Sequence, residues 1–173
     1  AEQDCAHWLN AVRVAVEQIS HVVPSAQWLG IGLSAMLPTL VCLDADGEPV
    51  GPAVTWQDSR AESWGDELRE GVTDLYERTG QWVDGRYLLP MWMRLRSIGN
   101  FDAKRVTALA GAKDYLVQWL TGELVTDPST AAGFGCYGLA EDSWLEDVLA
   151  SAGCSLRLPH IAASTTTLSL KAS

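Results

Sequence analysis

Apolar side chains recur every three or four positions near the start of the chain, as they do along the buried face of an amphipathic helix. This spacing predicts a helix over residues 5–20. Val22-Val23-Pro24 ends the pattern, because the residue before a proline is disfavoured in the helical region. The apolar positions that carry the pattern are Trp8, Leu9, Val12, Ala15, Val16 and Ile19.

Short apolar runs rich in β-forming residues follow this helix. They predict strands over residues 27–34, 39–44 and 52–56. The Asp46-Gly47 pair lies between the last two runs and favours a tight turn, so these runs are expected to pair as a hairpin. The sequence thus predicts three strands that form the core sheet.

Beyond Arg60 the spacing of apolar residues becomes helical. Glycines separate the runs, and Pro90 suits the first turn of a helix. The predicted helices cover residues 61–70, 73–79, 90–98 and 112–121.

The last part of the chain mixes a strand with a further helix. A strand is predicted over residues 133–139, and Ser143 is expected to cap a helix that runs to Ala152 and ends at Gly153. Strands and helices together predict an α/β domain.

Composition narrows the class of protein. A chain of 173 residues with 47% hydrophobic residues has the material for one folded domain. A net charge of −10 argues against binding to nucleic acid or to anionic membrane surfaces, because both attract basic proteins. The longest apolar runs, such as residues 37–43, fall far short of the roughly 20 residues that span a bilayer.

The cysteines and histidines lack the close spacing of a metal or redox motif. Neither a metal site nor a disulfide is predicted, and a reduced, cytoplasmic chain is the simplest interpretation. The residues concerned are Cys5, Cys42, Cys136, Cys154, His7, His21 and His160.

The segment Trp56-Gln57-Asp58-Ser59-Arg60 stands where the hairpin ends. A tryptophan followed by an acidic and a basic residue at the end of a strand is typical of a functional site. The alternative is that Trp56 packs under a loop while Asp58 and Arg60 form a surface ion pair. Spacing alone favours this alternative.

Short motifs spread along nearly the whole chain in a definite order. They are Glu2-Gln3-Asp4 with Trp8, Ile31-Gly32-Leu33-Ser34, the Trp56 segment, Arg78-Thr79-Gly80, Lys113-Asp114-Tyr115-Leu116, Leu120-Thr121-Gly122-Glu123, Asp127 with Ser129 and Ala131, and Leu158-Pro159 with Ile161 and Ser164. Each is common alone. Together, and in this order, they resemble the FGGY family of carbohydrate kinases.

The resemblance implies a ribonuclease H-like, actin-like ATPase fold, present here in part. It also implies transfer of the γ-phosphoryl group of ATP, with Mg2+, to a hydroxyl of a small sugar or polyol. Xylulokinases are the most similar members, then gluconokinases and glycerol kinases. Family members are commonly dimers, so a homodimer is one expected assembly.

Residues 1–173 correspond to part of the family's N-terminal, sugar-binding domain. The family's phosphate-binding strands, its catalytic aspartate and its C-terminal domain are expected outside this sequence, with the aspartate beyond Ser173. No catalytic residue and no metal ligand is therefore assigned within the chain, and the fragment alone is expected to be inactive. A noncatalytic sugar-binding or regulatory module is the alternative from another class.

Polar ligands of α/β folds bind at strand ends and in the adjoining loops. In the family, the loop after Ser34 carries a Met-His or an Arg-Glu pair, and these positions fall on Leu37 and Pro38. Neither side chain can donate a hydrogen bond to a sugar hydroxyl. The pocket then suits a smaller or less hydroxylated polyol, or it draws its donors from other loops.

The resemblance places Trp56 against the carbon-hydrogen side of the sugar. Asp58 can accept from sugar hydroxyls, and Arg60 either fixes that carboxylate through a bidentate pair or pins the loop. Tyr87 lies near the position of a pocket tyrosine in glycerol kinases. Arg78 and Asp114 are interpreted as structural residues that support the site.

Overall fold

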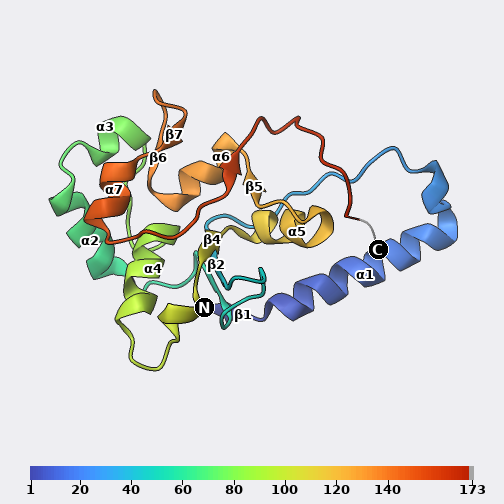
Figure 1. The fold of residues 1–173 in the computed structure, drawn as a ribbon, viewed down its shortest axis with the longest axis horizontal. Coiled ribbons are helices and arrows are strands. Elements are labelled where there is room, and N and C mark those ends of the chain that lie inside the picture. The colour runs from blue at the N-terminus through green and yellow to red at the C-terminus, as the bar shows by residue number, and fades with distance from the viewer. Residues whose placement is uncertain (172–173) are drawn as a thin grey trace.

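The computed structural model describes residues 1–171. Its centre is a four-stranded antiparallel sheet with the strand order β1-β3-β2-β4 (Figure 1). These strands are β1 (Glu2–Gln3), β2 (Thr39–Leu43), β3 (Ala53–Thr55) and β4 (Ala108–Ala110).

Helices surround the sheet, and short strands form two further pairs. Strand β5 is parallel to β8, and β6 is antiparallel to β7. The helices are α1 (Cys5–Val22), α2 (Glu62–Gly71), α3 (Leu75–Thr79), α4 (Leu88–Ser97), α5 (Ala112–Thr121), α6 (Pro128–Ala131) and α7 (Glu146–Ser151), with short 3-10 turns at Ser25–Gln27, Ala103–Arg105 and Ala132–Phe134. The remaining strands are β5 (Val125–Thr126), β6 (Tyr137–Gly138), β7 (Ser143–Trp144) and β8 (His160–Ile161).

Strand β2 divides the core into two layers. Successive side chains of a strand point to opposite faces. Leu40 and Cys42 accordingly join the larger apolar cluster, with α2, α4 and α7, while Val41 and Leu43 join a smaller one beneath the start of α1 and α5. Figure 1 shows α1 leading away from the sheet on one side, with α2, α3, α4 and α7 gathered on the other. Both faces of β2 are therefore covered, which explains its unbroken apolar run.

The hairpin and the helices predicted up to residue 121 are confirmed. Helix α1 begins after Asp4, whose carboxylate accepts a hydrogen bond of 2.9 Å from the amide of Ala6. Strands β2 and β3 pair antiparallel, and Gly47 takes a positive φ of 81° in the turn between them. Helices α2 to α5 lie where the apolar spacing predicts them, with small shifts at their ends.

The prediction of a strand over residues 27–34 is wrong. A 3-10 turn at Ser25–Gln27 is followed by chain without regular structure, in which Leu29 and Ile31 are exposed. A strand needs a neighbour for its amides and carbonyls. Within residues 1–171, this segment pairs with none of the strands of the three sheets.

Two predictions near the end of the chain are also wrong. Only Tyr137–Gly138 of the expected strand 133–139 is extended, because Gly135 has a positive φ of 81° after a 3-10 turn. Ser143 lies in β7 and caps no helix, since pairing of β6 with β7 draws it into a hairpin. Helix α7 starts later and is followed by Gly153, whose φ is 59°.

The structure adds two observations on predictions made from composition. All four cysteines are buried free thiols, and burial raises the pKa of Cys5 to about 11. Within the part of the chain that the structure describes, no helix is both long and apolar enough to cross a bilayer.

Candidate functional site

A cavity of about 230 Å3 lies at the end of the hairpin where β2 begins and β3 finishes. Its lining comes from three segments: Leu37 and Pro38, Trp56, and Arg86 with Tyr87. The first two segments meet because Thr39 pairs with Thr55 in the antiparallel register. The amide of Trp56 then donates to the carbonyl of Pro38 at 2.9 Å. Sheet register thus brings residues 37, 38 and 56 together.

Four of the five predicted substrate-binding residues lie in this lining: Leu37, Pro38, Trp56 and Tyr87. Leu37 and Trp56 are each about two-fifths exposed, with relative accessibilities of 40% and 41%. Asp58, the fifth, is buried and lies outside the lining.

Asp58 is held by donors on several sides. The Nε atom of Arg60 donates to Oδ1 at 2.9 Å and to Oδ2 at 3.0 Å, and the Arg60 amide donates to Oδ1 at 3.0 Å. The main-chain nitrogen of Ala1 lies 2.7 Å from Oδ2. Arg60 also contacts Glu2 in β1. The pair therefore ties the loop after β3 to the neighbouring strand, which favours the loop-pinning interpretation of Arg60.

These contacts predict a pH-dependent contribution to stability. The Arg60 hydrogen bonds hold the pKa of Asp58 well below its ordinary value, although burial acts in the opposite direction. A depressed folded-state pKa stabilises the protein fully above the unfolded pKa of about 3.9 and progressively less as the pH falls below it. We expect Asp58→Asn to lower the free energy of unfolding by about 2 kcal/mol at pH 7.

Urea unfolding of the complete protein at pH 7 and pH 3 measures this effect. The difference between wild type and Asp58→Asn should shrink at pH 3, and an equal difference at both pH values would contradict the assignment. Asp102→Asn is the control, because Asp102 is an exposed aspartate with no side-chain capping bond.

Sequence analysis missed Arg86. Asp84-Gly85-Arg86 repeats the spacing of Asp58-Ser59-Arg60. The contacts repeat as well, since the Arg86 amide donates to Asp84 Oδ1 at 2.9 Å and its Nε atom lies 3.1 Å and 3.0 Å from the two carboxylate oxygens. Burial raises the pKa of Asp84, but the Arg86 bonds outweigh it and the pKa stays below the ordinary value. This recurring Asp-x-Arg motif was the signal available in the sequence.

Two glycines set the position of the Asp84–Arg86 loop. A Cβ atom at Gly65 in α2 would lie 2.6 Å from the carbonyl carbon of Asp84. A Cβ atom at Gly85 would lie 2.5 Å from the carbonyl carbon of Ala61, and it would clash with the amide of Glu62. The first turn of α2 and the loop therefore cross backbone against backbone, which only glycine permits.

Comparison with known proteins decides the family. Residues 1–170 match the N-terminal domain of the FGGY family of carbohydrate kinases. The chain belongs to this family. The xylulose kinase of Staphylococcus xylosus is 28% identical over 151 residues, which cover 86% of this chain and 31% of that protein. The gluconokinase of Bacillus subtilis is 26% identical over 155 residues, or 88% of this chain and 30% of that protein.

Solved structures agree with this membership. The gluconate kinase of Lactobacillus acidophilus is 26% identical with a TM-score of 0.89, and the match covers 99% of this chain and 35% of that one. This FGGY chain therefore has the predicted ribonuclease H-like, actin-like fold. It spans about a third of the length of the proteins that it matches.

Two further predicted residues make structural contacts away from the cavity of this FGGY domain. Arg78 in α3 holds Asp147 of α7 in a bidentate pair, at 2.6 Å and 2.9 Å. Asp114 is fully buried and accepts from the Gly111 amide at 2.8 Å at the start of α5. Burial raises the pKa of Asp114, against the opposing effect of Lys113. Neither residue lines the cavity.

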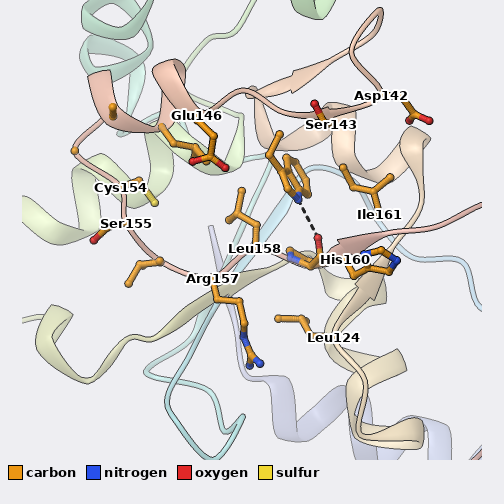
Figure 2. Close-up of a pocket in the computed structure, with 16 residues that line it drawn as sticks. Leu124, Asp142, Ser143, Glu146, Cys154, Ser155, Arg157, Leu158, His160 and Ile161 are labelled. Carbon is orange, nitrogen blue, oxygen red and sulfur yellow. Dashed lines mark hydrogen bonds between the residues drawn. The ribbon is translucent and has the colours of Figure 1, made fainter.

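A second, larger hollow of about 1150 Å3 lies beside α7 and the segment that leads to β8 (Figure 2). Trp144 lines it and donates to the carbonyl of Pro159 at 2.9 Å. Leucines and other apolar side chains make up much of its wall, including Leu124 and Leu158. None of the predicted site residues lines this hollow.

Proposed function

We propose that this FGGY chain forms part of the sugar-binding domain of a kinase that transfers the γ-phosphoryl group of ATP to a hydroxyl of a sugar or polyol. The observation that carries the proposal is the cavity at the end of the hairpin. It gathers Leu37, Pro38, Trp56 and Tyr87, which the family resemblance nominates for the sugar pocket. A concave site with a few polar groups on an otherwise apolar wall is typical of small-ligand binding.

The lining residues would bind and orient the acceptor. The exposed indole of Trp56 offers an apolar surface to the carbon-hydrogen side of a sugar. Leu37 and Pro38 supply an apolar wall that excludes water, while Asp58 and Arg60 hold the loop that carries Trp56. Fixing an acceptor in one geometry is a large part of catalysis in phosphoryl transfer.

We further propose that residues 1–173 are part of a longer N-terminal domain. The general-base aspartate, the phosphate-binding strands and the C-terminal domain would belong to other parts of the protein. The match to about a third of each relative supports this division.

ATP and Mg2+ are implied by the family. Within residues 1–171, no three His, Cys, Asp or Glu side chains gather in the manner of a metal site. We assign no contact with nucleotide or Mg2+ to these residues.

The acceptor classes follow the relatives. We propose xylulose first and gluconate second, because xylulose kinases and gluconokinases are among the similar relatives, with glycerol third from the family resemblance. The family also leads us to propose a cytoplasmic protein that forms a homodimer, which light scattering on the complete protein tests.

An ADP-release assay on the complete protein tests the function. With ATP and Mg2+ present, ADP release should depend on xylulose, gluconate or glycerol. Release that stays at the background rate with all three contradicts the proposal. Binding of these compounds without turnover would then favour the noncatalytic sugar-binding or regulatory module.

A further inference from the structure

Arg86 lines the cavity, and one edge of its guanidinium has no hydrogen-bond partner within residues 1–171. Its Nε atom and one terminal nitrogen are held by the carboxylate of Asp84. Among residues 1–171, the other terminal nitrogen, Nη1, contacts no acceptor. The matching Asp-x-Arg pair differs in its surroundings, because the terminal nitrogen of Arg60 that binds Asp58 also binds Glu2, and Arg60 lies outside the cavity lining.

The other side chains of the lining offer few donors. Leu37 and Pro38 have none, Trp56 has only its uncharged indole N–H, and the hydroxyl of Tyr87 donates to Oε1 of Gln81 at 2.8 Å. A sugar oxygen that leaves water for this cavity needs a replacement partner, since an unmet polar group is costly to bury. The free edge of Arg86 is the strongest donor available for that purpose.

The charge around Arg86 distinguishes classes of acceptor. The Asp84 carboxylate cancels the guanidinium charge at short range, and Glu62 of α2 adds a further negative field. The whole chain carries a net charge of −10. The cavity thus presents donors without a net positive charge, which suits hydroxyl and carbonyl oxygens and gives little attraction to a carboxylate.

We propose that Arg86 is a substrate-binding residue that donates from Nη1 to an oxygen of a neutral sugar, and that the Asp84–Arg86 pair makes the site selective for neutral acceptors over sugar acids. The proposal rests on the proposed kinase function. It also chooses between the two interpretations of Leu37 and Pro38: the donor that this loop lacks comes from the loop before α4.

Steady-state kinetics of the complete protein with D-xylulose and D-gluconate test the proposal. The wild type should favour xylulose in kcat/KM by about tenfold or more. Arg86→Met should lower kcat/KM for xylulose by roughly 10- to 100-fold, mainly by raising KM, because a charge-assisted hydrogen bond is lost.

Asp84→Asn supplies a readout that a purely structural role would not move. The amide oxygen still accepts from the Arg86 amide, but the compensating charge is gone. The ratio of kcat/KM for gluconate to that for xylulose should therefore rise by about fivefold or more. Arg105→Met is the matched control, because Arg105 is a similarly exposed arginine that pairs with Asp44 away from the cavity. Its loss should leave kcat/KM for xylulose and the gluconate-to-xylulose ratio unchanged.

Three outcomes overturn the proposal. These are a wild type that prefers gluconate, an Arg86→Met variant that keeps the KM for xylulose, and an Asp84→Asn variant whose ratio does not rise although its thermal midpoint matches wild type. Absence of turnover with every acceptor contradicts the kinase function instead. In that case, calorimetric titration of wild type and Arg86→Met with xylulose still decides the role of Arg86.

Discussion

Replacing Gly85 with alanine is expected to displace the Asp84–Arg86 loop and to disable the cavity. A Cβ atom there would lie 2.5 Å from the carbonyl carbon of Ala61, and the neighbour is backbone at the start of α2. A rigid helix turn cannot move aside as a flexible side chain can. We expect a loss of about 3 kcal/mol in the free energy of unfolding, at the upper end for overpacking.

The same substitution should abolish ADP release, because Arg86 and Tyr87 follow directly in the chain. Urea unfolding and the ADP-release assay on the complete protein measure the two effects. Gly99→Ala is the matched control, since a Cβ atom at Gly99 meets nothing within 4 Å. Gly85→Ala with unchanged stability and activity would mean that the close crossing of α2 and the loop does not support the site.

Replacing Trp56 with alanine is expected to have the largest effect on substrate binding with little effect on folding. The indole lines the cavity and is 41% exposed, so its removal leaves no buried void. A sugar would lose the apolar surface on which its carbon-hydrogen side rests. We expect kcat/KM for the acceptor to fall by about 100-fold, while the free energy of unfolding changes by less than about 1 kcal/mol.

Kinetics of the complete protein, together with its thermal midpoint, measure this prediction. Trp28→Ala is the control, because Trp28 lies outside the cavity and its indole nitrogen donates to the carbonyl of Val23. An unchanged KM for every acceptor in Trp56→Ala would place the sugar elsewhere and would count against the cavity as the site.

Local pattern was sufficient for the elements that depend on nearby residues. The helix over 5–20 follows from apolar spacing, and the β2–β3 hairpin follows from two apolar runs around Gly47. Both kinds of element satisfy most of their hydrogen bonds within a short stretch of chain. Family membership could also be inferred from the sequence, because the order of its motifs resembles that of the family, and the family model matches residues 1–170.

Strand pairing between distant segments could not be predicted from local sequence patterns. Residues 27–34 have the composition of a strand, yet a strand forms only where a neighbour accepts its hydrogen bonds. Strands β1 and β4 have only two and three residues, too short for a periodic signal, but they complete the sheet. Ser143 has the chemistry of a helix cap, and β6 draws it into a strand instead.

Some features of the candidate site likewise follow from the sequence, and others depend on the tertiary structure. The sequence alone nominated Leu37, Pro38, Trp56, Asp58 and Tyr87 through resemblance, and it showed that the first two cannot donate to a sugar. The structure leaves Asp58 outside the cavity lining. The sequence held the Asp-x-Arg pattern twice but offered no means of telling the two copies apart. The crossing of Gly65 and Gly85 brings Arg86 to the cavity, whereas Glu2 engages Arg60 at the sheet edge. That difference arises from backbone contacts between segments far apart in the chain, which only the tertiary structure decides.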